Sequence, residues 1–126
     1  MIVVNYVRKT KMAYKFSITI DYPDGKTHDQ YLVWFEEKIG SPKFTKLLDR
    51  LVDEEELVTS DNRKTTRIDD GCRVVQTNYY RYENHASAMH YDLTMLLQSF
   101  DEYLVISDIE TITEVEYNST KSQMNY

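Results

Sequence analysis

The stretch from Asp69 to Phe100 constrains the fold most, because a turn, a strand and a helix follow one another within it. Asp69-Asp70-Gly71 is a turn signal, and the β-branched and aromatic residues after it are typical of a strand. Alternate side chains of a strand point to opposite faces. One face therefore carries Val74, Gln76, Asn78, Tyr80 and Tyr82, and the other carries Arg73, Val75, Thr77, Tyr79 and Arg81. Neither set is purely apolar, so we predict that one face of this strand is only partly buried.

The residues after this strand predict a helix. Asn84 is a favourable N-cap, because its side-chain oxygen can accept hydrogen bonds from the free amides of the first turn. Apolar residues then recur at helical spacing and predict a single stripe that faces the core: Met89, Leu93, Leu96, Leu97 and Phe100.

The first half of the chain predicts a hairpin. Polar and apolar residues alternate over Tyr14–Tyr22, which is typical of a strand with one buried face. Pro23-Asp24-Gly25-Lys26 is a turn signal, since Pro fixes φ and Gly tolerates positive φ. We predict that Asp29–Phe35 forms the second strand and that Trp34 within it is buried.

A second helix is predicted from Ser41-Pro42, where Ser can cap the free amides and Pro suits the first helical position. Its apolar stripe consists of Phe44, Leu47, Leu48, Leu51 and Val52. Asp49, Asp53 and Glu56 recur at helical spacing on the opposite side, so we expect them on the solvent-facing side of this helix.

Three further strands are predicted, over Arg63–Ile68, Tyr103–Ser107 and Ile109–Tyr117. On the last of them Glu110, Glu114 and Glu116 share one face. Because same-face strand residues lie about 6.8 Å apart, Glu114 and Glu116 are expected to form a short, regular row of carboxylates.

The resulting order, ββαββαββ, predicts a single α+β domain. Two β-hairpins and the C-terminal strands form an antiparallel sheet, and two amphipathic helices pack on one face of it, since each helix has one apolar stripe. We place the domain at residues 13–118, with a flexible or short-strand arm at 1–12 and a polar tail at 119–126.

The formal net charge is −6, which argues against direct binding to nucleic acid or to an anionic membrane, where Lys and Arg are needed. The charge is compatible with a basic protein partner. The sequence shows no signal-peptide pattern and no long apolar run, so we expect a cytoplasmic protein. Its single cysteine, Cys72, excludes an intramolecular disulfide.

No catalytic, cofactor or metal motif is recognisable. His85 and His90 are five residues apart on the predicted helix and would point in different directions, which is poor geometry for shared metal ligation. His90 and Asp92 are two apart and do not face each other. Gly25, Gly40 and Gly71 are isolated, so no phosphate-binding loop is predicted. We therefore predict a protein that is not an enzyme.

The acidic side chains carry the strongest functional hypothesis. Between residues 49 and 61 six acids stand against Arg50 alone. Together with interspersed tyrosines they could imitate the charge of a nucleic-acid backbone and attract a groove lined with Lys and Arg. In composition the chain is similar to the small acidic inhibitors that phages and mobile elements carry against host nucleases. The predicted contact residues are Asp49, Asp53, Glu54, Glu55, Glu56, Tyr79, Tyr80, Tyr82, Glu110, Glu114 and Glu116.

The resemblance implies a DNA mimic that inhibits a basic nucleic-acid-binding protein in the host cytoplasm, such as a restriction nuclease or, in an anti-CRISPR role, a CRISPR effector. The alternative is a self-associating assembly module that dimerises through the tyrosine-rich strand, because exposed strand edges and aromatic faces can pair across a two-fold axis.

Overall fold

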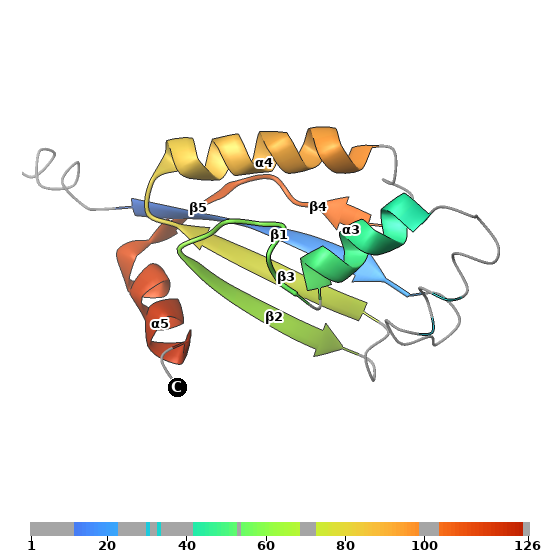
Figure 1. The fold of residues 1–126 in the computed structure, drawn as a ribbon. Helices are drawn as coiled ribbons and strands as arrows, with labels where there is room; N and C mark the ends of the chain where they lie inside the picture. The colour runs from blue at the N-terminus through green and yellow to red at the C-terminus, as the bar shows by residue number, and fades with distance from the viewer. Residues whose placement is uncertain are drawn as a thin grey trace, which may run out of the picture.

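A computed structural model describes residues 12–22, 30, 33, 42–52, 54–68, 73–98 and 104–124. The elements, in chain order, are β1 (Met12–Asp21), α3 (Pro42–Val52), β2 (Asn62–Ile68), β3 (Arg73–Tyr80), α4 (Glu83–Leu97), β4 (Leu104–Ile106), β5 (Glu110–Thr113) and α5 (Glu114–Met124). Figure 1 shows α4 and α3 over one face of the sheet and α5 at the end where β5 lies. The described residues therefore form a small α+β domain, as the sequence predicts.

β1 lies at the centre of an antiparallel sheet with the order β2-β3-β1-β4, and β5 pairs with the same strand β1. Tyr14 of β1 lies opposite Tyr80 of β3, and Asp21 lies opposite Arg73. The predicted hairpin around residues 69–71 is confirmed by the antiparallel pairing of β2 with β3. Both edges of β3 are thus occupied, by β2 on one side and by β1 on the other.

β4 and β5 are two halves of one strand beside β1. Three residue steps separate Lys15 from Ile18 in β1, whereas four separate their partners, Glu110 and Ile106. The extra residue is a bulge, and Ser107 stabilises it. The Ser17 amide donates to Ser107 Oγ at 2.8 Å, and the Ser107 amide donates to the Ser17 carbonyl oxygen at 2.8 Å.

The main core lies between the sheet and the two helices α3 and α4. The alternation predicted for β1 and β3 is confirmed, because one face of each strand enters this core. Both helices contribute buried residues from one side: Leu47, Leu48, Leu51 and Val52 of α3, and Ala86, Leu93 and Leu97 of α4. Leu96, which was expected in the stripe, is 40% exposed, and Phe100 lies outside the described residues.

α5 packs on the opposite face of the sheet. There Tyr117 joins Ala13, Tyr79 and Ile112 in a second, smaller apolar cluster. Helices therefore lie on both faces, not on one face as predicted. Because α5 covers only one end, side chains such as Lys64 and Thr66 of β2 stay exposed.

The strand predicted through Tyr117 is wrong from Glu114 onward, because α5 begins there. Thr113 caps this helix, since the Glu116 amide donates to Thr113 Oγ1 at 3.2 Å. A Thr followed three residues later by Glu is a capping-box signature, and acidic residues in a first turn are stabilised by the helix dipole. These effects at the start of the helix outweigh the strand-like alternation, which continues through Tyr117.

Two further predictions need correction. α4 begins at Glu83, with Tyr82 at the N-cap and no side-chain capping bond, so Asn84 is not the cap. Gln30 and Val33 are helical, which contradicts the strand predicted over Asp29–Phe35 at those two positions. The rest of that strand, including Trp34, and the arm before Met12 lie outside the described residues. Within the described residues, no helix has the length and apolar character needed to cross a membrane.

Candidate partner-binding surface

The turn that follows α3 gathers three consecutive acids, Glu54, Glu55 and Glu56, all exposed. The helix was expected to continue to Glu56 but ends at Val52. Main-chain bonds close the end: the Glu54 amide donates to the Asp49 carbonyl oxygen and the Glu56 amide to that of Arg50, each at 3.0 Å. We call Glu54–Glu56 the acidic turn.

Glu55 adopts φ of 53°, in the left-handed region where helices usually end on glycine. For a residue with a Cβ atom this conformation costs roughly 1–2 kcal/mol. Residues in such conformations persist when surrounding contacts hold them, and they occur often at functional sites. The contacts that hold Glu55 in this conformation therefore explain the shape of the turn.

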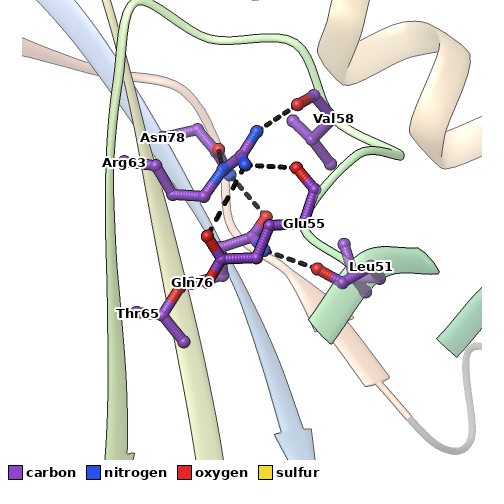
Figure 2. Close-up of polar contacts among 7 residues, drawn as sticks. All are labelled: Leu51, Glu55, Val58, Arg63, Thr65, Gln76 and Asn78. Atoms are coloured by element: carbon purple, nitrogen blue, oxygen red, sulfur yellow. Dashed lines mark hydrogen bonds and ion pairs between the residues drawn. The ribbon is translucent and has the colours of Figure 1, made fainter. Parts of the chain in front are cut away.

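Arg63 of β2 supplies those contacts, as Figure 2 shows. Its guanidinium donates to the carbonyl oxygen of Glu55 at 2.5 Å and to the carbonyl oxygen of Val58. The Glu55 carboxylate lies 3.9 Å from Arg63 Nη1 and accepts a hydrogen bond from Thr65 Oγ1 at 3.0 Å. One half-buried arginine thus fixes both the backbone and the side chain of Glu55.

Two buried amides hold Arg63 in turn (Figure 2). Arg63 Nε donates to Asn78 Oδ1 at 3.0 Å, and Asn78 Nδ2 donates to Gln76 Oε1 at 3.1 Å. Gln76 Nε2 then donates to the carbonyl oxygen of Leu51, in the last turn of α3, at 2.8 Å. Asn78 is fully buried and Gln76 nearly so. Because buried polar groups must find partners, this chain ties α3, the acidic turn and the sheet together.

The charges of the acidic turn repel one another. A hydrogen bond with the Glu56 carboxyl group, followed by the charges of Glu56 and Asp49, raises the pKa of Glu54 above its usual value. Arg50 opposes this shift and donates from Nε to Glu56 Oε1 at 3.1 Å. The acids also follow the C-terminus of α3, where the helix dipole disfavours negative charge. Glu54 is therefore unfavourably placed, whereas the two acids that follow it lie beside Arg50 and Arg63.

Glu114 and Glu116 of α5 are in the opposite situation. Arg81 Nη2 donates to Glu114 Oε1 at 3.1 Å, and Lys15 Nζ donates to Glu116 Oε2 at 2.8 Å. The bond with Glu116 raises the pKa of Lys15. The expected row of strand carboxylates does not exist, because both residues lie on a helix, where Glu116 pairs with Lys15 of β1 and Glu114 with Arg81, just after β3.

The remaining predicted contact residues are dispersed. Tyr79 and Tyr80 are buried, and the Tyr80 hydroxyl donates to the Thr59 carbonyl oxygen at 2.6 Å, whereas Tyr82 is 59% exposed. Glu110 is exposed on β5, far along the chain from the acidic turn. Asp49 is half-buried beside the turn, and Asp53 lies outside the described residues. The structure thus brings together Asp49 with Glu54–Glu56 and does not join them to the tyrosines.

The two histidines of α4 occupy separate places. His85 is exposed at the start of α4, whereas His90 Nε2 lies 2.9 Å from the Ser107 carbonyl oxygen and its ring meets the Phe16 ring edge-on. Among the described residues, no group of three or more His, Cys, Asp or Glu side chains is placed to hold a metal ion.

Sequence reasoning missed Arg63, Gln76 and Asn78 as the supports of the site. The signal was present, since Gln76 and Asn78 lie on the same strand face as Val74 and Tyr80, and buried amides need polar partners. No protein-family model matches this chain, and no curated protein is similar to it in sequence. Its function is therefore argued from the geometry.

Proposed function

We propose that this protein is a non-enzymatic inhibitor that binds a basic nucleic-acid-processing protein in the host cytoplasm, with the acidic turn as the primary contact. A nuclease of a restriction or CRISPR system is the partner class that the composition suggests. The partner would present Lys and Arg side chains that otherwise contact phosphates. The chain would occupy that groove as a mimic of DNA charge.

Three consecutive exposed glutamates on a backbone that Arg63 holds in place carry this proposal, and the raised pKa of Glu54 agrees with it. Arg50 in the last turn of α3 follows the usual preference for a base at a helix C-terminus, whereas Glu54 and Glu56 beyond the helix go against it. Local violations of such rules concentrate at functional sites. A basic partner would relieve both the mutual repulsion and the clash with the helix dipole. Binding energy would then come from charges that cost stability in the free protein.

The hydrogen bonds from Arg63 preorganise the acidic turn for binding. Its backbone is fixed by hydrogen bonds to Glu55 and Val58 before any partner arrives. A preformed contact loses less conformational entropy on association than a flexible one. Exposed carboxylates also steer encounter, so the association rate should be high at low salt and should fall as salt is added.

The experiment compares two matched double neutralisations that change the net charge equally. Glu54→Gln with Glu56→Gln removes two of the three charges of the acidic turn, and Glu114→Gln with Glu116→Gln removes two charges at the start of α5. The tagged wild-type chain is used at low salt to capture a nuclease from a host lysate. Association rates and DNA cleavage are then measured with the purified nuclease.

We expect the turn variant to slow association at least tenfold and to lose inhibition, with a smaller change for the α5 variant. Equal losses of binding in both variants would show that binding depends on the net charge of the protein and not on the acidic turn. Failure of the wild-type chain to capture or inhibit a nucleic-acid-processing protein would overturn the proposed function.

A further inference from the structure

The outward side of α4 carries a stripe that no part of the described structure covers. Ala86, Leu93 and Leu97 face the core. On the opposite side of the helix lie Asn84, Ala88, Tyr91 and Met95, all exposed, with Tyr91 at 64% and Met95 at 48%. A helix facing solvent normally shows charged residues there, yet none of these four is charged. We call these four residues the outer seam.

The outer seam has the spacing of a helix–helix contact. Its members are separated by four, three and four residues, which is the repeat that keeps one stripe of a helix against a neighbouring helix. From Asn84 to Met95 it extends roughly 16 Å at 1.5 Å per residue. The geometry therefore points to a second helix as its occupant.

We propose that the occupant is α4 of a second copy of this chain, packed antiparallel across a two-fold axis. In the register that superimposes the two seams, Tyr91 meets Ala88 of the second copy and Met95 meets its Asn84. Each contact sets a large side chain against a small one, which allows two helices to interdigitate. A two-fold interface repeats both contacts.

A polar pair on one flank agrees with this register. His85 and Asp92 are seven residues apart, exposed, and on the same flank of the outer seam. In an antiparallel pair the same flanks of the two helices adjoin, so Asp92 of one copy lies beside His85 of the other, twice. The helix contains no Lys or Arg, and its other acid, Glu83, lies before the seam, so no pair of acids opposes across the contact.

A groove beside the seam leaves room for the large side chains. It has a volume of about 250 Å³ and lies between α4 and residues 59–61, with His85, Ala88 and Asp92 on its wall. Because Ala88 is small and borders this groove, the groove leaves space for a second helix to approach on this flank. The contact is short, so we expect a reversible dimer with a dissociation constant on the order of tens of micromolar. This inference does not depend on the proposed function, since it uses a different surface.

Sedimentation velocity of the full chain between 5 and 200 μM tests the proposal. We expect the wild-type chain to shift from monomer to dimer over this range. Tyr91→Lys and Met95→Lys should each weaken the dimer at least tenfold, because each places two charges in the seam. Val105→Lys, at an apolar β4 residue that is also 64% exposed, should leave the dissociation constant unchanged.

A charge exchange tests the antiparallel register. Asp92→Lys alone should weaken the dimer several-fold, because His85 then loses its carboxylate partner. Asp92→Lys combined with His85→Asp should restore it, because a cation and an anion then adjoin. Circular dichroism verifies that each variant folds, and Ala88→Glu replaces any seam variant that does not. A wild-type monomer at 200 μM, a dimer insensitive to the seam variants, or a double exchange without recovery would each overturn the proposal.

Discussion

The acidic turn and the start of α5 each hold exposed or half-exposed glutamates with basic neighbours, yet they lie at opposite ends of a helix. Glu114 and Glu116 lie at a helix N-terminus and bond to Arg81 and Lys15. Glu54 and Glu56 follow a helix C-terminus and crowd one another. The same residue type therefore stabilises the fold in one place and strains it in the other. A run of acids in a sequence therefore predicts an acidic binding surface only when the positions of helix ends and of neighbouring basic side chains are taken into account.

The largest effect is expected from Arg63→Met. The change removes the donor to the carbonyl oxygens of Glu55 and Val58 and leaves Asn78 without its Arg63 contact. We expect the free energy of unfolding to fall by about 3 kcal/mol, because breaking a half-buried charged network leaves polar groups unpaired. Urea denaturation measures it. Lys64→Met, at the next and exposed residue, is the control and should change stability by less than about 0.5 kcal/mol. Equal, small effects would show that Arg63 does not hold the turn.

Glu116→Lys should destabilise the fold by about 1 kcal/mol. The variant sets a lysine against Lys15 in place of an ion pair and puts a positive charge in the first turn of α5, where the helix dipole disfavours it. Urea denaturation at low salt gives the value, and added salt should shrink it. A variant as stable as the wild-type chain would mean that α5 does not depend on these charges.

In contrast to Glu116→Lys, Glu54→Lys should stabilise the fold and raise the midpoint of urea denaturation. The substitution removes a charge that repels Glu56 and Asp49 and places a cation after the C-terminus of α3, where the dipole favours it. The same variant should bind the partner less well, so stability and function would change in opposite directions. A lowered midpoint would contradict the contrast between the two regions.

The smallest expected effect is on the pH dependence of stability. The pKa of Glu54 is raised in the folded protein above its ordinary value of 4.5, so the folded state holds this proton more tightly than the unfolded chain. The contribution of Glu54 to stability should therefore decrease as the pH rises from about 4.5 through the raised pKa. Denaturation midpoints of wild type and Glu54→Gln, measured from about pH 4 to pH 7, should diverge in that direction. Parallel curves would show that Glu54 titrates normally.

The sequence by itself determined the elements whose signals are local. Alternation identified β1, and a turn signal followed by β-branched and aromatic residues identified the β2–β3 hairpin. The apolar stripe of Leu47, Leu48 and Leu51 identified α3, and Ser41-Pro42 identified its start. These patterns suffice because a strand or helix with one apolar face buries that face in nearly any packing. The concentration of acids after Arg50 was also visible in the sequence, although not its geometry.

Only the tertiary structure decided which acids lie beside which bases. Lys15 and Glu116 are about a hundred residues apart, and no local pattern predicts that they meet. α5 could have been recognised from Thr113 and Glu116, but its position over Ala13 and Tyr79 follows from packing on the far face of the sheet. Likewise Arg63 reaches Glu55 because β2 pairs with β3 and α3 packs above them. Charges act through space, and distances in space are fixed by the fold.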